Sequence, residues 1–434
     1  MQPWYQRYKN NESASAIIIG GGISGAATAY SLAIRGYKVR LYEKNHELAG
    51  EGSGNYQGLV YGTLHGNYTP LTELHFLGLS YSHNLIQKLL TKSIDYDKSG
   101  LIQIYNDNKT MKMYEAITKN HKIFQENLNQ DQKNHLFPID IIKHNTDSIC
   151  TYLNHDEIEK ISKVKITPSD GLYFPNGIWL HPKNFVQKLV AHPNIQIILN
   201  MEIDDLKLIK NIDNYTWQIK SKNQIIDTTE NLVLCNAHAT LKFSYTSDLL
   251  LRKTHGQTTK IKLSNSPQTS ICRESYIIPE SNGYATIGAT FNHHSSKSEI
   301  NDCDHLENIN NISKFLPNIK NTQLDNLMGH AAIRCGSPDY LPIVGPVAEA
   351  QSFYQTYKNL ALDKNLQIDS VCPYLPGLYL NLAHGAKGFT TAPISGEIVA
   401  GYISNNTLIC SENLRQKIHP NRMLLKNIIF KKFS

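Results

Sequence analysis

Residues 16–33 read Ala-Ile-Ile-Ile-Gly-Gly-Gly-Ile-Ser-Gly-Ala-Ala-Thr-Ala-Tyr-Ser-Leu-Ala. The β-branched run is followed by three glycines and then by small residues, an order that predicts a strand, a tight turn and a helix. After Gly36, the segment Tyr37 to Glu43 predicts a second strand. Together they form a βαβ unit of about 30 residues. The stretch therefore predicts an α/β fold built around a parallel sheet.

The glycines of this turn have the spacing of a dinucleotide-binding motif. Gly20 permits the tight turn, Gly22 lets the backbone approach a pyrophosphate, and Gly25 lets the helix pack closely on the strand. Amides at the start of the helix favour a negatively charged group. Glu43 stands 18 residues after Gly25, where a carboxylate can bind ribose hydroxyls. We predict a Rossmann-type dinucleotide site, with a purely structural glycine turn as the alternative.

Three features favour FAD over NAD as the dinucleotide. The motif lies close to the first residue of the chain, and a second glycine-rich loop, residues 52–58, follows Glu43 directly. A third loop, Gly385 to Gly388, precedes an apolar stretch that predicts a helix from about Ala392 to Tyr402.

The order of predicted elements suggests two interleaved domains. We expect a discontinuous FAD-binding domain formed by residues 13–92, 181–238 and 325–434. Residues 93–180 and 239–324 are expected to form an α+β substrate domain with a mostly antiparallel sheet, since the strand-like runs there alternate and lack a dinucleotide motif.

Composition sets broad limits on the protein class. The 434 residues carry 41% hydrophobic and 18% charged side chains, which is typical of a globular rather than a disordered protein. Seven scattered cysteines without a Cys-x-x-Cys pair argue against a disulfide framework or a zinc site, so we expect no metal. The chain has neither an apolar run of about 20 residues nor a signal peptide, which predicts a cytoplasmic protein without membrane contact.

These motifs resemble the D-amino-acid-oxidase-like flavoenzymes, which include glycine oxidase and sarcosine oxidase, over nearly the whole chain. A narrower resemblance is to the FAD-dependent oxidoreductase domain of the bifunctional MnmC family. The segments that carry it are Gly52 to Gly58, Trp179 to Pro182, His255 to Gln257, Ile287 to Thr290, Ile333 to Cys335, Asp339 to Gly345, Gly385 to Pro393 and Pro420 to Arg422.

The MnmC resemblance implies a reaction on tRNA. Members of that family oxidise the carboxymethylaminomethyl group of wobble uridine 34 to aminomethyl and release glyoxylate. They normally carry a methyltransferase domain before the flavin domain, but here 15 residues precede the first strand. We therefore expect this chain to perform the oxidation alone, with a separate methyltransferase as a candidate partner.

Two places depart from the family pattern. Gly62 stands where relatives usually have proline, and Asn236-Ala237-His238 replaces a more glycine-rich turn. Some sarcosine oxidases attach flavin through a cysteine near Arg334, but Ala332 stands at the matching position, so we expect non-covalent FAD.

Arg334 is the main candidate catalytic residue. By resemblance to glycine oxidase, it would hold the substrate carboxylate, which a planar guanidinium recognises through two parallel hydrogen bonds. The alternative is a structural ion pair with Asp339. Lys387, with the amides of the last glycine loop, would stabilise negative charge on reduced flavin. The remaining cofactor-binding candidates are Ser53, Gly54, Asn55, Gln57, Gly58, Gly385, Ala386, Gly388, Phe389 and Thr390.

Other residues remain open to two interpretations. His181 and His255 lie in family motifs, but histidines in turns commonly make structural hydrogen bonds. The segment from Ser411 to the last residue is basic and would either contact RNA phosphates or form a solvated face. Its charged residues are Arg415, Lys417, Arg422, Lys426, Lys431 and Lys432 against Glu412.

Two rival functions fit the same motifs. One is an oxidase or dehydrogenase of free glycine, sarcosine or a D-amino acid, because fold alone does not fix function. The other is a non-catalytic flavin-containing subunit that binds tRNA.

Overall fold

The computed structural model describes residues 3–5, 13–64, 66–105, 109–128, 149–210, 215–292, 298–321, 327–406 and 408–430. The chain forms two compact units. The first comprises Met1–Gly50, Leu189–Arg252 and Cys335–Ser434, and the second comprises Glu51–Lys188 and Lys253–Arg334. Compared with the predicted boundaries, residues 51–92, 181–188 and 325–334 fall in the second unit and residues 239–252 fall in the first.

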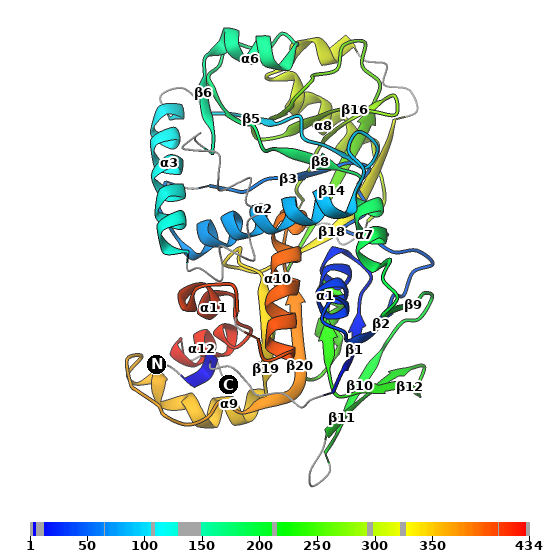
Figure 1. Ribbon diagram of the computed structural model, residues 1–434, viewed down its shortest axis with the longest axis vertical. Coiled ribbons are helices and arrows are strands. Elements are labelled where there is room, and N and C mark those ends of the chain that lie inside the picture. The colour runs from blue at the N-terminus through cyan, green and yellow to red at the C-terminus, as the bar shows by residue number, and fades with distance from the viewer. Residues whose placement is uncertain are drawn as a thin grey trace. The chain divides into compact units, whose positions relative to one another are not determined.

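The first unit is built on the predicted Rossmann-type sheet (Figure 1). Its strand order is β19-β20-β13-β1-β2-β9, and the pairs are parallel except β19 with β20. Residues Ala16 to Ile19 are buried on both faces of the sheet, as expected for the central strand of such a layer. The strands are β1 (Ser15–Ile19), β2 (Lys38–Tyr42), β9 (Ile195–Ile198), β13 (Leu232–Leu234), β19 (Ile343–Ala348) and β20 (Tyr374–Leu382).

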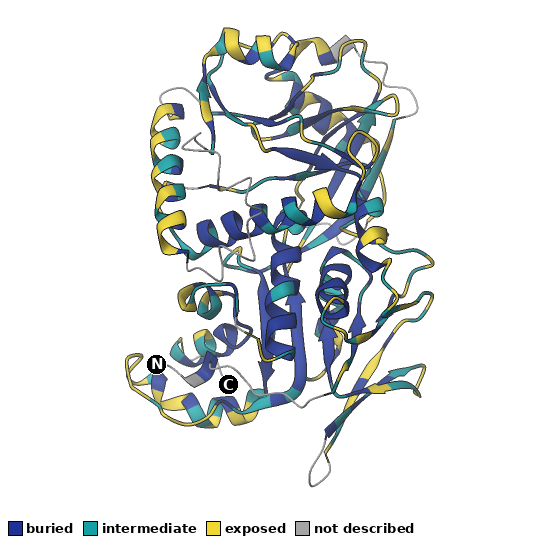
Figure 2. Cartoon of the chain, viewed as in Figure 1, coloured by how far each residue is buried: buried dark blue, intermediate teal, exposed yellow. Residues whose placement is uncertain are grey.

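Two helices, α1 (Ile23–Ala33) and α10 (Gly388–Ile403), pack against each other and against this sheet (Figure 1). Nearly every residue of both helices is buried (Figure 2), which explains their small and apolar composition. A Cβ on Gly396 of α10 would stand 2.8 Å from the backbone nitrogen of Thr28 in α1. Glycine at this position therefore sets the close approach of the two helices.

The rest of the first unit consists of a small antiparallel sheet and several short helices. The sheet has the order β10-β11-β12, with β10 (Asp205–Lys210), β11 (Tyr215–Ser221) and β12 (Gln224–Thr229). The helices are η1 (Pro3–Tyr5), η2 (Ala237–Lys242), α9 (Ala350–Tyr357), η4 (Lys358–Ala361), α11 (Glu412–Ile418) and α12 (Arg422–Ile429).

The second unit is built on an eight-stranded sheet of order β18-β14-β17-β16-β15-β5-β7-β6. Most of its pairs are antiparallel, and β15 with β5 is parallel. The predicted α+β character of this region is confirmed. The strands are β5 (Leu101–Ile104), β6 (Thr151–Leu153), β7 (Gly171–Phe174), β14 (Arg252–Ile261), β15 (Ser270–Cys272), β16 (Tyr276–Ser281), β17 (Tyr284–Gly288) and β18 (Met328–Gly336).

A three-stranded sheet of order β3-β8-β4 and a set of helices complete the second unit. Its strands are β3 (Gly58–Val60), β4 (Tyr96–Asp97) and β8 (Ile178–Leu180). The helices are α2 (Pro70–Leu89), α3 (Thr110–Asn127), α6 (His155–Ser162), α7 (Pro182–Val190), α8 (Asp302–Ser313) and η3 (Pro317–Asn321). Among the described residues, no helix is both long enough and apolar enough to cross a membrane.

Candidate active site

The glycine turn after β1 has the strained geometry that the motif predicts. Gly20 has a φ of +110°, a conformation that side-chain-bearing residues rarely adopt. A Cβ on Gly25 would stand 1.9 Å from the carbonyl oxygen of Gly20, so only glycine permits this junction of strand and helix. Gly22 is the N-cap residue of α1, and no side chain makes a capping hydrogen bond at this helix end.

The carboxylate of Glu43 is buried and faces the glycine turn. Its Oε2 accepts a hydrogen bond of 2.6 Å from the amide of Gly21, and its Oε1 accepts one of 2.9 Å from the amide of Asn45. A carboxylate has about four acceptor sites, so both oxygens retain lone pairs for ribose hydroxyls. Glu43 is thus held in the orientation that a nucleotide site needs.

The N-termini of α1 and α10 lie next to each other. A Cβ on Gly388, the first residue of α10, would stand 3.4 Å from Cγ2 of Ile23, the first residue of α1. Neither helix has an acidic residue in its first turn. The N-terminal ends of two helices therefore converge on one region, and their dipoles favour negative charge there.

The loop before α10 is fixed by an internal network. Gly385 has a φ of +57°, and its amide donates a hydrogen bond of 2.8 Å to the carbonyl of Cys335. The carbonyl of Lys387 accepts hydrogen bonds from the amides of Thr390 and Thr391, so its backbone starts the helix. Along the rest of the predicted segment, Ala386 is exposed, whereas Phe389 and Thr390 are buried.

His384 is a further residue of this loop that the sequence did not identify. Its Nε2 lies 2.8 Å from Oδ1 of Asn381, and its Nδ1 lies 2.9 Å from Oγ1 of Thr391. Because Oδ1 only accepts hydrogen bonds, Nε2 carries the proton and Nδ1 of the neutral ring faces the threonine hydroxyl. Burial lowers the pKa of His384 to about 3, so the ring is neutral and rigidly placed. The position of His384 between β20 and the glycine loop is the signal that would have found it.

The second glycine-rich loop, residues 52–58, lies in the second unit. Some of its polar side chains already make hydrogen bonds within that unit. Gln57 is fully buried; its Nε2 donates to the carbonyl of Pro279, and its Oε1 accepts from Thr286. Asn55 accepts a long hydrogen bond of 3.4 Å from Thr258. Gly58 begins β3, and Gly54 is bonded to the carbonyl of Glu51. Ser53 is half-buried in the same loop. Gln57 therefore shapes this loop from inside the second unit.

Arg334 lies in β18 of the second unit and is held from several sides. Its Nη1 donates a hydrogen bond of 3.2 Å to the carbonyl of Thr290. Its guanidinium carbon lies 4.7 Å from the ring centroid of Phe291. A Cβ on Gly256 would stand 1.9 Å from Nη1, so glycine leaves the space that the guanidinium occupies.

Two tyrosines, Tyr61 and Tyr276, interact electrostatically with Arg334. Burial raises the pKa of Tyr276 to about 12 and raises that of Tyr61 well above its usual value, while the positive charge of Arg334 opposes both shifts. Both hydroxyls are therefore protonated at neutral pH. Burial also lowers the pKa of Arg334, although the side chain stays cationic.

The alternative ion pair between Arg334 and Asp339 is wrong. Asp339 instead accepts hydrogen bonds from Nε and Nη2 of Arg422, at 3.1 and 3.0 Å, and from Nζ of Lys426, at 2.7 Å. These two cations hold the pKa of Asp339 well below its usual range despite burial. Within the described part of the chain, Arg334 has no acidic partner.

The ion pairs that Asp339 forms with Arg422 and Lys426 change the interpretation of the basic C-terminal segment. Arg422 is buried, and both Arg422 and Lys426 are paired with Asp339. They fasten α12 to the loop after β18. Arg415 and Lys417 lie in the last turn of α11, where positive charge favours the helix dipole. Lys431 and Lys432 lie outside the described residues.

Both candidate histidines make structural contacts. His181 bonds the carbonyl of Tyr56 through Nδ1 and the hydroxyl of Ser281 through Nε2. His255 is buried with its Nδ1 3.7 Å from a carboxylate oxygen of Asp304. The structural interpretation accounts for both rings.

Residues 15–402 match the family model for FAD dependent oxidoreductases. The chain belongs to this family. It is thus an FAD-dependent oxidoreductase, and the expected flavin cofactor is confirmed. Glu43 and the two adjacent helix ends of the first unit fit the ribose and the charged groups of this cofactor.

Relatives of the oxidoreductase are known in bacteria. It is 34% identical to the tRNA 5-methylaminomethyl-2-thiouridine biosynthesis bifunctional protein MnmC of Chromobacterium violaceum, over 100% of this chain and 63% of that protein. The protein of the same name from Pseudomonas syringae pv. syringae is also 34% identical, over 99% of this chain and 61% of its own length. The oxidoreductase therefore spans somewhat under two thirds of these relatives.

Solved structures share its fold. Glycine oxidase from Geobacillus kaustophilus has a TM-score of 0.68 at 15% identity, covering 94% of this chain and 98% of that chain. Iminodiacetate oxidase from Chelativorans sp. BNC1 also has a TM-score of 0.68, at 16% identity, covering 93% of this chain and 98% of that chain. The predicted glycine-oxidase-like fold is confirmed.

Proposed function

We propose that this oxidoreductase removes the carboxymethyl group from the carboxymethylaminomethyl side chain of wobble uridine 34 in tRNA. The observation that carries the proposal is Arg334, a half-buried cation without an acidic partner among the described residues. The substrate side chain is an N-substituted glycine, so its carboxylate would supply the missing partner. Similarity to the tRNA-modifying MnmC proteins supports tRNA as the molecule that bears this group.

The reaction converts a secondary amine into a primary amine and glyoxylate. A hydride leaves the methylene carbon between nitrogen and carboxylate, and the nitrogen loses its proton, which gives an imine. Water adds to the imine carbon, and the C–N bond breaks to release glyoxylate and the aminomethyl nucleoside. FAD, when bound, supplies the two-electron acceptor for the hydride.

The roles of the residues follow from their positions. Arg334 binds the carboxylate and thereby fixes the methylene carbon, a task of orientation rather than of strong base catalysis. Tyr61 and Tyr276 keep their protons and can donate hydrogen bonds beside it. Lys387 and the amides at the start of α10 would stabilise negative charge on the reduced cofactor. The remaining predicted cofactor residues would bind FAD non-covalently, except Gln57, whose amide is bonded within the second unit; they are Gly20, Gly22, Gly25, Glu43, Ser53, Gly54, Asn55, Gly58, Gly385, Ala386, Gly388, Phe389 and Thr390.

Location follows from the substrate. If tRNA is oxidised, the reaction takes place in the cytoplasm, and the uridine at the wobble position is the reacting nucleotide.

The direct test is anaerobic reduction of the purified, FAD-loaded protein. Transfer RNA bearing carboxymethylaminomethyluridine should bleach the flavin absorbance and release one glyoxylate per flavin, whereas tRNA lacking the modification should do neither. Bleaching by free glycine or sarcosine but not by the modified tRNA would select the free amino-acid oxidase instead. If neither class of compound reduces the flavin, a non-catalytic role is favoured.

A further inference from the structure

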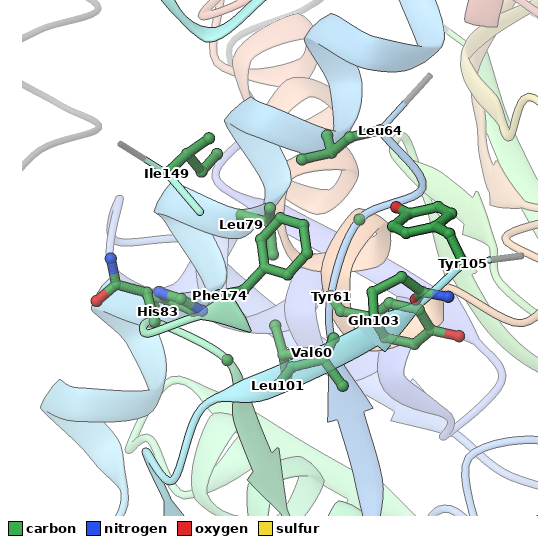
Figure 3. Close-up of a pocket in the computed structure, with 13 residues that line it drawn as sticks. Val60, Tyr61, Leu64, Leu79, His83, Leu101, Gln103, Tyr105, Ile149 and Phe174 are labelled. Carbon is green, nitrogen blue, oxygen red and sulfur yellow. The ribbon is translucent and has the colours of Figure 1, made fainter. Parts of the chain in front are cut away.

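A cavity in the second unit is lined by Tyr61, one of the two tyrosines that interact with Arg334 (Figure 3). It is bounded by α2, β3, β5 and β7, all within this unit. Most of its wall is apolar, and Phe174 supplies a broad ring surface at its centre. The apolar side chains of the wall are Val60, Leu64, Leu79, Leu101, Ile149 and Phe174.

Five polar side chains also line this cavity within the described part of the chain: Tyr61, His83, Gln103, Tyr105 and Asn176. Nε2 of His83 is buried without a partner. The side chains of Gln103 and Tyr105 are half-buried and make no hydrogen bond within the described part of the chain. Burial, reinforced by the charge of Lys98, lowers the pKa of His83 to about 4, so its ring is neutral. A buried polar group without a partner is costly, which indicates that a ligand or water satisfies Nε2 of His83.

The cavity and Arg334 are connected along one face of the eight-stranded sheet. Gln103 stands opposite Cys272, and Cys272 stands opposite Tyr276. Residues paired across neighbouring strands project from the same face. Tyr61, which lines the cavity, hydrogen-bonds Cys272 and interacts with both Tyr276 and Arg334. Tyr61 therefore stands between the arginine and the cavity.

The chemistry of the cavity selects a class of ligand. Apolar walls with an aromatic ring suit a flat, weakly polar group. The amide of Gln103 offers a donor beside an acceptor, which complements the N–H beside a carbonyl on the edge of a uracil ring. Neither lysine nor arginine lines the cavity among the described residues, which disfavours a phosphate.

We propose that this cavity binds the pyrimidine ring of the uridine whose carboxymethylamino arm reaches Arg334. The inference rests on the proposed function and deepens it. Gln103 recognises the polar edge of the ring, Phe174 packs on its face, and Tyr61 lies beside the arm that joins ring to carboxylate. The cavity would thus let the enzyme prefer a modified uridine over a free N-alkyl glycine.

The experiment measures binding and turnover with three forms of the holoenzyme. These are the wild type, Gln103→Leu, which removes the polar edge contact, and Gln218→Leu. Gln218 is a matched control, because it is a half-buried glutamine in β11 that does not line the cavity. Affinity for 5-carboxymethylaminomethyluridine is measured by calorimetry under anaerobic conditions, and flavin absorbance and melting temperature confirm folding. We expect Gln103→Leu to weaken binding at least tenfold and Gln218→Leu to leave it unchanged.

Two results would overturn the inference: equal affinity of all three forms for the nucleoside, or an unchanged KM of Gln103→Leu for the modified tRNA. Leu79→Trp, which places a larger side chain in the cavity wall on α2, is a second test variant and should also raise KM. A failure of the proposed function can be told apart from a failure of the pyrimidine site. If uridine binds in a Gln103-dependent manner but the modified tRNA never reduces the flavin, the pyrimidine site stands and the reaction is wrong.

Discussion

The guanidinium of Arg334 occupies the space that a side chain on Gly256 would fill, with Nη1 only 1.9 Å from the ideal Cβ position. The two residues are 78 positions apart in the sequence, on β14 and β18, which are neighbours in the eight-stranded sheet. The absence of a side chain at 256 is therefore a requirement for the position of the arginine.

Gly256→Ala should displace the guanidinium without unfolding the protein, because Gly256 has no positive φ. We expect at least a tenfold higher KM for the carboxylate-bearing substrate, and a smaller change in kcat. Steady-state kinetics with matched flavin content would measure this. Gly66→Ala is the control, since a Cβ there meets nothing within 4 Å. Equal KM values for both variants would contradict the packing argument.

Arg334→Lys tests recognition of the carboxylate by a planar group. Lysine keeps the charge but loses the paired donors and the contact with Phe291. Loss of one charged hydrogen bond costs about 1.5–3 kcal/mol, so kcat/KM should fall by about 10- to 100-fold. Bound FAD, measured by absorbance, should stay unchanged. A variant with wild-type kcat/KM would place the carboxylate elsewhere; Arg252→Lys, on the exposed start of β14, is the control.

The first strand, the glycine turn and the helix after it could be predicted, because residues close together in the sequence determine them. The glycines at 20, 22 and 25 and the β-branched run before them dictate strand, turn and helix within 20 residues. The start of α10 was not predicted correctly. The apolar stretch predicted a start near Ala392, but the helix begins at Gly388 and contains Pro393. Packing of a nearly fully buried helix against α1 and the sheet outweighs the backbone hydrogen bond that proline removes.

Contacts between distant residues could not be predicted from the sequence. Asp339 is five residues from Arg334 and was a plausible partner, yet its charge is satisfied by Arg422, 83 residues away. Gln57 lies in a glycine-rich loop that suggests a cofactor contact, but its amide is bonded to Pro279 and Thr286. Which partner each of these side chains binds depends on residues that are distant in the sequence and adjacent only in the folded protein.

Gly396→Ala should separate α1 from α10. The new methyl group would stand 2.8 Å from a backbone nitrogen, where no flexible side chain can yield. Overpacking of this kind costs about 1–3 kcal/mol. Because we propose that both helix ends bind FAD, we expect a lower melting temperature together with weaker FAD binding. Gly50→Ala, whose Cβ would have only ordinary contacts, should change neither. Destabilisation with unaltered FAD affinity would show that the helix spacing does not serve the cofactor.

Glu43→Gln tests the nucleotide site in the first unit. The carboxylate holds the amides of Gly21 and Asn45, one on each oxygen, and glutamine can accept at only one of these positions. We expect FAD affinity to fall about tenfold, in line with loss of one charge-assisted hydrogen bond. Quenching of FAD fluorescence during titration of the apoprotein measures it. Glu47→Gln, four residues further along, is a comparison on the same loop; equal effects of both changes would argue against a specific role of Glu43.

The neutral, buried ring of His384 should make stability depend on pH. Its pKa is lowered to about 3 by burial, whereas an unfolded histidine titrates near 6.5. Between these values the unfolded chain binds a proton that the folded chain excludes, so the contribution is present above about pH 6.5 and is lost as pH falls towards 3. The slope is about 1.4 kcal/mol per pH unit. His419, whose pKa is also lowered to about 3, adds to the total.

His384→Gln should flatten the decline in the free energy of unfolding, measured with urea, between pH 6 and pH 4.5. His46→Gln, at an exposed site, is the control and should leave the slope intact. An unchanged slope in His384→Gln would mean that the ring is protonated in the folded protein.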